Sequence, residues 1–262
     1  MDLHLTGRTA VVTGASRGIG LAVAGALVRE GARVVTGSRE ITPELRALAA
    51  EGDVLSVAVD LTAPEGPAEL IAAATFAYGG LDILVNNVGA VRPRTDGFLA
   101  VTDDDWAATL SVNLLAPVRT TRAALPHLLE RGAGSIVTVS SVNAFLPDPL
   151  VIDYSASKAA LSNFCKSLSK QVGPQGVRVN TVSPGPVTTG LWLARDGVAA
   201  TVAAATGASA DAVAERAAAD AATGRFTRPD EVADLVVFLA GDRAANITGS
   251  DFVVDGGLVS TL

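Results

Sequence analysis

A glycine turn between a short apolar run and a longer apolar segment constrains the fold of this chain most tightly. Residues 9–12 have the pattern of a buried strand and residues 21–28 that of a buried helix. The turn between them contains Gly14, Gly18 and Gly20. Because these residues have no Cβ, the chain can turn sharply and the helix can pack closely against the strand. The sequence therefore predicts an α/β fold that begins with a strand, a tight turn and a helix.

Strand-like and helix-like segments alternate along the whole chain. After the first strand, apolar runs rich in β-branched residues predict strands at residues 33–38, 54–59, 82–86, 135–140, 177–182 and 251–254. Helices are predicted near residues 18–30, 43–51, 66–78, 103–130, 154–172 and 229–240. Repeated βα units imply a doubly wound parallel sheet of about seven strands with helices on both faces. We expect a single domain over residues 1–262, with ligands at the carboxyl ends of the strands.

Composition argues against several classes of protein. The formal net charge is −7 at pH 7, whereas nucleic-acid surfaces rely on clustered Lys and Arg. The one cysteine, Cys165, cannot form an internal disulfide and is expected to be a small buried residue. No apolar run approaches the roughly 18 residues of a membrane span, and residues 1–8 lack a signal-peptide core. We expect a soluble cytoplasmic protein without nucleic-acid or membrane partners, and we assign no metal site.

The glycine turn is a candidate nucleotide site. The N–H groups of the first helical turn are free to face an anion, and the missing Cβ atoms let a phosphate approach the backbone. The spacing G-x-x-x-G-x-G differs from the general dinucleotide pattern G-x-G-x-x-G, so a purely structural turn is the alternative. Residues 14–18 also match the G-x-S-x-G nucleophile elbow of hydrolases. That chemistry needs a histidine base, and the chain has only His4, before the first strand, and His127, near a helix end.

The end of the second predicted strand selects between nucleotides. An acidic residue there would bind a ribose 2′-hydroxyl, but this chain has Ser38 followed by Arg39. Arg17 lies inside the glycine turn, and two guanidinium groups suit a 2′-phosphate. This favours NADP(H) over NAD(H). The alternative is that both arginines are solvated surface residues.

The predicted helix at residues 103–130 contains Asn113 and then Pro117. Proline has no N–H, so the bond that residue 117 would donate to the Asn113 carbonyl is missing if the helix continues through both. A carbonyl freed in this way can hold a water. A kinked packing helix is the alternative when Asn113 is taken alone.

Ser141, Tyr154 and Lys158 form a second candidate site. Tyr154 and Lys158 are four residues apart on a predicted helix and share one face, and Ser141 ends the preceding strand. A nearby ammonium favours the phenolate, and lowering the tyrosine pKa from ~10 by ~2–3 units corresponds to about 3–4 kcal/mol. Tyr154 would then exchange a proton with a carbonyl or alcohol oxygen that Ser141 also hydrogen-bonds. Packing is the alternative for such a pair, although the other tyrosine, Tyr78, has no comparable lysine.

Five motifs together make the chain resemble the short-chain dehydrogenase/reductase family over essentially its whole length. They are TGASRGIG at residues 13–20, NNVG at residues 86–89, Ser141 with YSASK at residues 154–158, PG with VT at residues 184–188, and VDGG at residues 254–257. Two departures are mild, because Val88 stands where alanine is usual and Ala116 where glycine is frequent. Neither departure removes a reacting group.

The resemblance implies a Rossmann fold and an active-site tetrad of Asn113, Ser141, Tyr154 and Lys158. Lys158 would also bind the nicotinamide ribose, and the Asn113 main chain would hold a water that relays protons to it. The adenine is assigned to Asp60 and Leu61, the adenosine side to Asn87 and Gly89, and the carboxamide to Val187 and Thr188. With the turn and the second strand, the expected coenzyme site is Gly14, Ser16, Arg17, Gly18, Ile19, Gly20, Ser38, Arg39, Asp60, Leu61, Asn87, Gly89, Tyr154, Lys158, Pro184, Val187 and Thr188.

Similar proteins are usually tetramers, so a homotetramer is expected. The helix after Tyr154 supports assembly independently, because its apolar residues spread over more than one face. They are Ala159, Ala160, Leu161, Phe164, Cys165, Leu168 and Val172. Burial of this wide face within the monomer is the alternative.

Two stretches are expected to shape the substrate pocket. Residues 142–153 lie between Ser141 and Tyr154, and their content predicts a mainly apolar site. The alanine-rich segment 186–224 predicts two short helices broken around residues 206–207, and it resembles the family's substrate lid; a surface insertion is the alternative. The expected substrate contacts are Asn143, Phe145, Leu150 and Trp192.

We expect an NADP(H)-dependent carbonyl reductase or alcohol dehydrogenase, in which hydride moves between nicotinamide and a carbonyl carbon while Tyr154 moves the proton. Arg92 and Arg94 either hold an acidic substrate tail or are exposed charges. A 3-oxoacyl-thioester reductase is an alternative, although the overall acidity weakens it. Its candidate docking patch for an acidic carrier protein is Arg119, Arg122 and Arg131. The alternative of another class is a nucleotide-sensing binding protein without catalysis, which the complete tetrad disfavours.

Overall fold

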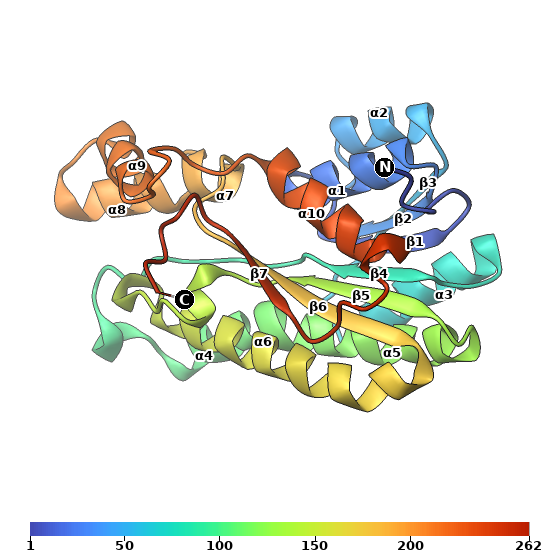
Figure 1. Ribbon diagram of the computed structural model, residues 1–262. Helices are drawn as coiled ribbons and strands as arrows, with labels where there is room; N and C mark the ends of the chain where they lie inside the picture. Colours follow the sequence, from blue (N-terminus) through green and yellow to red (C-terminus); the bar gives the residue numbers. More distant parts are fainter. Residues whose placement is uncertain (262) are drawn as a thin grey trace.

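The structure, a computed structural model, describes residues 1–261 (Figure 1). A seven-stranded parallel sheet runs through its centre in the order β3-β2-β1-β4-β5-β6-β7. The strands are β1 (Thr9–Thr13), β2 (Arg33–Ser38), β3 (Val54–Ala58), β4 (Ile83–Asn86), β5 (Gly134–Val139), β6 (Val177–Pro184) and β7 (Asp251–Val254). The chain builds outward from β1 to β3 and then returns to place β4 beside β1. The predicted doubly wound sheet is confirmed, and its topological switch point lies between β1 and β4.

Helices cover both faces of the sheet (Figure 1). One face carries α1 (Gly18–Arg29), α2 (Pro43–Glu51) and α10 (Pro229–Ala240). The other carries α3 (Gly66–Tyr78), α4 (Asp103–Leu110), α5 (Ala116–Glu130) and α6 (Ile152–Val172). Short 3-10 turns lie at Phe98–Ala100 (η1), Val142–Ala144 (η3), Pro149–Val151 (η4), Gly173–Gln175 (η5) and Asp242–Ala244 (η6).

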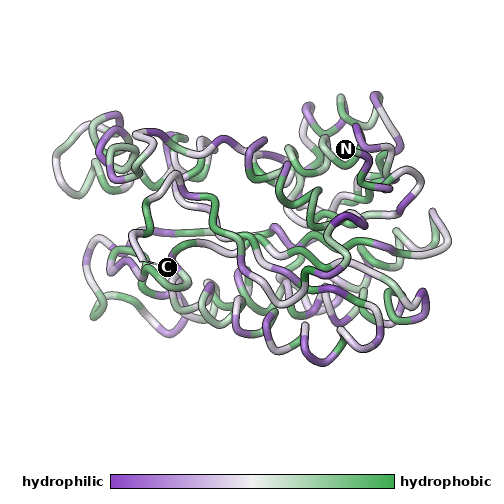
Figure 2. Tube along the Cα trace, in the orientation of Figure 1, coloured by the Kyte–Doolittle hydropathy of each residue, from purple (hydrophilic) through white to green (hydrophobic). Residues whose placement is uncertain are grey.

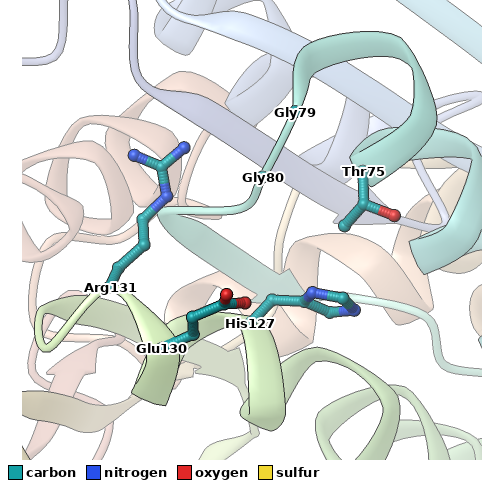
Figure 3. Close-up of a pocket in the computed structure, with 6 residues that line it drawn as sticks. All are labelled: Thr75, Gly79, Gly80, His127, Glu130 and Arg131. Carbon is teal, nitrogen blue, oxygen red and sulfur yellow. The ribbon is translucent and has the colours of Figure 1, made fainter.

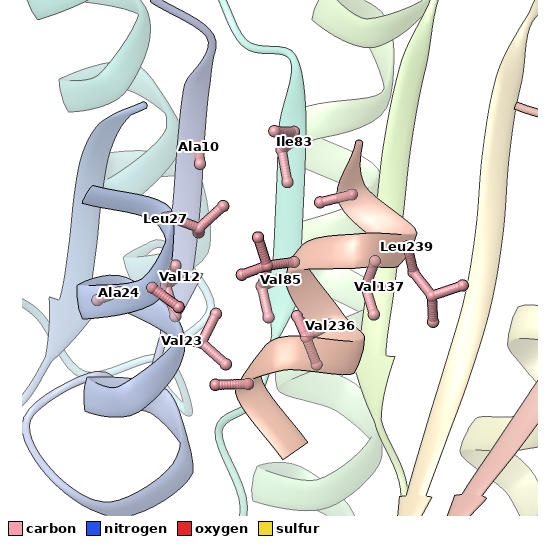
Figure 4. Close-up of a cluster of buried hydrophobic side chains, with 14 of the residues drawn as sticks. Ala10, Val12, Val23, Ala24, Leu27, Ile83, Val85, Val137, Val236 and Leu239 are labelled. Carbon is pink, nitrogen blue, oxygen red and sulfur yellow. The ribbon is translucent and has the colours of Figure 1, made fainter. Parts of the chain in front are cut away.

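Alternation along the strands divides the core into two layers. Val12 and Val85 pack beneath α1 and α10 (Figure 4), whereas their neighbours Val11 and Leu84 point to the opposite face and its helices. Successive residues of a strand face opposite sides, so consecutive apolar residues in a strand bury both faces of the sheet. Hydrophilic residues concentrate on loops and on the outer turns of the helices (Figure 2).

The predicted helix at residues 103–130 is continuous, but it consists of two α-helices joined by a π-helical turn. A π-helical turn, η2 (Ser111–Leu115), separates α4 from α5, and the Ala116 N–H bonds to the Ser111 carbonyl. Pro117 follows at the start of α5, where a residue without an N–H costs little. The expected local disturbance of the helix is therefore present.

The segment predicted as a lid consists of α7 (Gly190–Leu193), α8 (Val198–Thr206) and α9 (Ala210–Ala219). Gly207 ends α8 in the left-handed conformation, with φ of 73°, which places the break where the sequence predicts it. Among residues 1–261 no single helix is long and apolar enough to cross a membrane; the lid helices pass that test only as a pair bent by 107°.

Candidate active site

The residues singled out by the sequence follow neighbouring strands at one edge of the sheet. The glycine turn follows β1, residues 87–90 follow β4, and Ser141 follows β5. Since all strands are parallel, these segments meet at the carboxyl edge, beside the switch point between β1 and β4.

The glycine turn is held by an asparagine from the next strand. Gly14 and Gly18 have positive φ values of 66° and 58°, a conformation that a Cβ would strain. The Asn87 side-chain Nδ2 donates to the Thr13 carbonyl (3.0 Å) and to the Gly14 carbonyl (3.1 Å). A Cβ on Gly20 would lie 2.4 Å from both Asn87 Nδ2 and the Gly14 oxygen, so only glycine fits there. Asn87 thus shapes the turn, a role that the sequence analysis missed.

The first turn of α1 has the character of an anion site. Arg17, at the N-cap, is exposed and makes no side-chain capping hydrogen bond. Arg39 is also exposed and follows β2, which pairs with β1. The Thr42 hydroxyl donates to the Ser16 carbonyl (2.9 Å) and so holds the loop after β2 against the glycine turn. Ser38 is buried, with its hydroxyl donating to the Glu40 carbonyl (2.7 Å).

Asp60 and Leu61 lie where the adenine side is expected, beyond the end of β3. Hydrogen bonds from Thr62 and the charge of Arg39 lower the pKa of the Asp60 carboxyl, so Arg39 and Asp60 face a common region. Leu61 is buried. On the opposite side, a Cβ on Gly18 would lie 3.3 Å from Thr189, which follows the predicted Val187 and Thr188.

Asn113 is fully buried in the π-helical turn, and its side chain is hydrogen-bonded to the loop after β4. Its Nδ2 donates to the carbonyls of Ala90 (2.8 Å) and Thr109 (3.1 Å), and its Oδ1 accepts from the Ala90 N–H (3.1 Å). A Cβ on Gly89 would lie 3.1 Å from Asn113 Oδ1 and 3.6 Å from Lys158 Nζ. The structure therefore brings Asn113, Gly89 and Lys158 together.

Ser141, Tyr154 and Lys158 meet beside that loop. The Ser141 hydroxyl lies beside the Tyr154 phenol, whose pKa it influences, and it accepts the Asn143 N–H (3.2 Å). Lys158 is 3% exposed, donates from Nζ to the Val139 carbonyl (2.9 Å) and lies 5.7 Å from the centre of the Tyr154 ring. The two side chains are thus neighbours on one face of α6, as predicted.

The electrostatics differ from the sequence-based expectation. Burial raises the pKa of Tyr154, and the neighbouring Ser141 side chain offsets this only in part. Burial also lowers the pKa of Lys158 to about 8, from an ordinary value of 10.5. The expected lowering of the tyrosine pKa by the lysine is therefore wrong for the protein alone, because desolvation favours the neutral form of each group.

Arg94 fits neither of the two roles that the sequence left open. Its side chain is only 10% exposed and pairs with Asp153 and with Asp105, whose Oδ1 lies 2.8 Å from Nη1. Such a guanidinium is saturated by protein carboxylates and is not available for a substrate tail. Arg92, with 78% of its side chain exposed, matches the exposed-charge alternative.

The expected substrate residues are distributed around the same edge. Asn143 supports the turn after Ser141, since its Oδ1 accepts from the Ser141 hydroxyl (3.2 Å) and its Nδ2 donates to the Leu146 carbonyl (3.3 Å). Phe145 and Leu150 are exposed. Trp192 in α7 packs edge-on against Phe226 at 5.2 Å between ring centres.

The pocket in Figure 3 lies at the opposite edge of the sheet, between the end of α3 and the end of α5. Its lining includes Gly79, Gly80, His127 and Arg131, all of which precede β4 or β5. His127 is therefore remote from residues 14–18, and the hydrolase alternative has no base there.

Known proteins resemble this chain along its length. A family model described as enoyl-(acyl carrier protein) reductase matches residues 14–259. The chain belongs to the short-chain dehydrogenase/reductase (SDR) family. Human dehydrogenase/reductase SDR family member 4 is 35% identical over 98% of this chain and 90% of its own length. The 3-oxoacyl-[acyl-carrier-protein] reductase FabG of Vibrio cholerae is 33% identical, over 98% of this chain and 99% of its own.

The fold is shared with an SDR of known structure. L-Sorbose reductase from Gluconobacter frateurii, solved with NADPH and L-sorbose, superposes with a TM-score of 0.92 and 34% identity, covering 100% of both chains. The predicted family and fold class are therefore confirmed, and the chain is an oxidoreductase of the SDR family.

Proposed function

We propose that this SDR transfers a hydride between NADP(H) and a ketone or secondary alcohol, with Tyr154 as the general acid and base. The observation that carries this proposal is the meeting of Ser141, Tyr154 and Lys158 at the carboxyl edge of the sheet, next to Gly89 and the glycine turn. A phenol, a hydroxyl and an amine there form a site for one polar oxygen of a substrate.

The coenzyme is NADP(H), which the related L-sorbose reductase binds as NADPH. The residues present fit it, because Gly14, Gly18 and Gly20 leave no side chain at the start of α1, where a pyrophosphate is stabilised by free N–H groups. We assign the 2′-phosphate to the exposed Arg17 and Arg39. The remaining predicted contacts, at Ser16, Ile19, Ser38, Asp60, Leu61, Asn87, Gly89, Pro184, Val187 and Thr188, line the same edge or support its loops.

The bound coenzyme supplies or accepts the hydride. Tyr154 donates a proton to the carbonyl oxygen during reduction, and its raised pKa keeps the phenol protonated at neutral pH. The Ser141 hydroxyl stabilises charge on the same oxygen. Asn113 holds the loop after β4 in place through Ala90, and its main chain is assigned to a proton-relaying water.

The substrate is assigned as a ketone with apolar substituents. Phe145, Leu146 and Leu150 are exposed on the segment that joins Ser141 to Tyr154, and Leu191 and Leu193 are exposed on the lid helix α7. Exposed apolar side chains gathered near a site favour an apolar ligand.

The structure weakens the alternative of a carrier-bound 3-oxoacyl substrate. Of the arginines in the candidate docking patch, Arg119 donates to the Thr62 carbonyl (3.0 Å) and Arg131 lies 3.3 Å from Asp82. Arg122 is exposed. Because one relative is a 3-oxoacyl-[acyl-carrier-protein] reductase, a 3-oxoacyl thioester should still be included among the substrates that are tested.

Assembly as a homotetramer is also proposed, through the outer side of α6, where Ala159 and Ala160 are exposed and Phe164 is half-buried. The cytoplasmic location stays a prediction from composition.

The test is consumption of NADPH by the purified protein with aliphatic ketones, aryl ketones, a ketose and a 3-oxoacyl thioester. Tyr154→Phe should abolish turnover while still binding NADPH. Tyr78→Phe is the matched control, because that phenol bonds to Asp53 outside the site. If NADPH binds and no ketone is turned over above the Tyr154→Phe rate, the nucleotide-sensing alternative replaces this proposal.

A further inference from the structure

A buried ion pair lies directly behind the proposed acid–base tyrosine. Asp153 precedes Tyr154 in the first turn of α6, and its side chain is 2% exposed. Its Oδ2 accepts from Arg94 Nε (3.2 Å), Arg94 Nη2 and the Thr109 hydroxyl (2.7 Å). Arg94 also pairs with Asp105 of α4 and donates its main-chain N–H to the Leu150 carbonyl (2.6 Å). The guanidinium thus ties the loop after β4 to both α4 and α6.

Thr109 connects this ion pair to Asn113. Its hydroxyl donates to Asp153, while its carbonyl accepts the Asn113 Nδ2 at 3.1 Å. Asn113 in turn clasps Ala90, which lies on the same loop as Arg94. The contacts close a ring through the loop after β4, the end of α4 and the first turn of α6. That ring joins the segments that carry Asn113 and Tyr154.

We propose that Arg94 is a positioning residue, which acts through Asp153 and Thr109 to hold Tyr154 in register with Asn113 and the loop after β4. The inference rests on the proposed function of Tyr154. Arg94 touches no reacting atom, so it acts only through the placement and the surroundings of Tyr154, and displacement of a reacting group by about 1 Å can cost about 100-fold in rate.

The buried carboxylate explains why an arginine is needed at this position. Asp153 Oδ1 is buried and has no hydrogen-bond partner among residues 1–261, so Oδ2 carries the contacts that keep the group ionised. Burial alone would raise the pKa of Asp153, but the bonds from Arg94 and Thr109 lower it below its ordinary value. Without Arg94, an uncompensated charge would stand one residue from the phenol, and α6 would have to shift or take in water.

The experiment compares Arg94→Met with Arg92→Met, a matched change two residues earlier on an exposed side chain. We expect Arg94→Met to lower kcat at least about tenfold, with the Kd for NADPH within about twofold of wild type. Arg94→Lys keeps the positive charge but cannot pair with Asp153 and Asp105 at the same time, so it should recover kcat only in part. If Arg94→Met does not fold, Thr109→Val takes its place in the comparison. This change removes one hydroxyl with little change in volume, and it should lower kcat about threefold.

A second readout does not depend on turnover. The chain has two tyrosines, so in a Tyr78→Phe background the absorbance titration reports Tyr154 alone. Arg94→Met should raise the apparent pKa of that phenol relative to Arg92→Met, and Arg94→Met/Asp153→Asn should reverse the rise.

The outcomes separate the two hypotheses. If wild type turns over a ketone but Arg94→Met keeps its kcat and its Tyr154 titration, the positioning role is overturned, even where the melting temperature falls. If no ketone is turned over above the Tyr154→Phe rate, the proposed function fails, and the titration still decides whether Arg94 controls the phenol.

Discussion

Replacing Gly20 by alanine should damage the coenzyme site, whereas the same change at Gly25 should not. Both residues lie in α1. A Cβ on Gly20 would sit 2.4 Å from Asn87 Nδ2 and 2.4 Å from the Gly14 carbonyl oxygen. A Cβ on Gly25 would lie 3.4 Å from the flexible end of Arg29 and 3.8 Å from Leu48, which are ordinary contacts. Comparing the Gly20→Ala and Gly25→Ala variants therefore separates the effect of the close packing between α1, the glycine turn and Asn87 from the general effect of an alanine in this helix.

The magnitude follows from what has to move at Gly20. Overpacking a tight site costs about 1–3 kcal/mol. Displacing Asn87 also loses its bonds to the Thr13 and Gly14 carbonyls, each worth about 1 kcal/mol. The gain in helix propensity, about 1 kcal/mol, offsets part of this loss. We expect Gly20→Ala to lower the free energy of unfolding by about 2–4 kcal/mol and Gly25→Ala to raise it by up to about 1 kcal/mol.

Two measurements test this prediction. Urea unfolding gives the free energy of unfolding, and a titration with NADPH, followed by the intrinsic fluorescence of the protein, gives the Kd. We expect Gly20→Ala to weaken NADPH binding about 100-fold, or about 2.7 kcal/mol, because the turn that faces the pyrophosphate is displaced. Gly25→Ala should bind NADPH as wild type does. Equal stability and equal NADPH affinity in the two variants would refute the assignment of Gly20 as a required close approach.

Three further predictions concern charge and the lid. Lys158→Met should abolish turnover. It should also raise the free energy of unfolding by about 3 kcal/mol below pH 8, because the unfolded chain keeps this lysine protonated to about pH 10.5, whereas burial lowers its folded pKa to about 8. Between those pH values the free energy of unfolding of the wild type rises, so its difference from the Lys158→Met variant shrinks. A difference that does not change with pH in urea titrations would contradict the lowered pKa of Lys158. Arg39→Asp should weaken NADPH binding at least about tenfold more than NADH binding, and equal losses would remove Arg39 from 2′-phosphate recognition. Trp192→Ala, which loses the contact with Phe226, should raise KM for the ketone with little change in kcat; unchanged KM would exclude Trp192 from the substrate side.

The order of the elements could be predicted because each strand contains a run of apolar, mostly β-branched residues and each connection is long enough for a helix. The ends of two elements differ from the prediction. The strand predicted to end at residue 182 continues to Pro184, and the helix predicted to start at residue 154 begins at Ile152. Pairing with β7 extends the first, and the 3-10 turn η4 leads directly into the second. Such ends depend on neighbours that local sequence does not specify.

The proximity of the proposed reacting groups was predicted from spacing, but the contacts that hold them were not. Tyr154 and Lys158 are four residues apart on one helix, so their proximity is local. Arg94 and Asp153 are 59 positions apart, and no spacing rule joins them. The same holds for Asn87 and Gly14, which meet only because β1 and β4 are adjacent. Long-range polar contacts follow from the topology, which has to be known first.

The sign of the tyrosine pKa shift shows why proximity is not sufficient. An ammonium beside a phenol lowers the phenol pKa only while the amine remains charged, and burial acts against the charged form of both groups. In this protein Lys158 has a pKa of about 8, and the pKa of Tyr154 is raised above its ordinary value of 10. The same burial that raises the pKa of Tyr154 thus keeps the phenol protonated, which is the form in which the proposed acid would give its proton to a ketone oxygen.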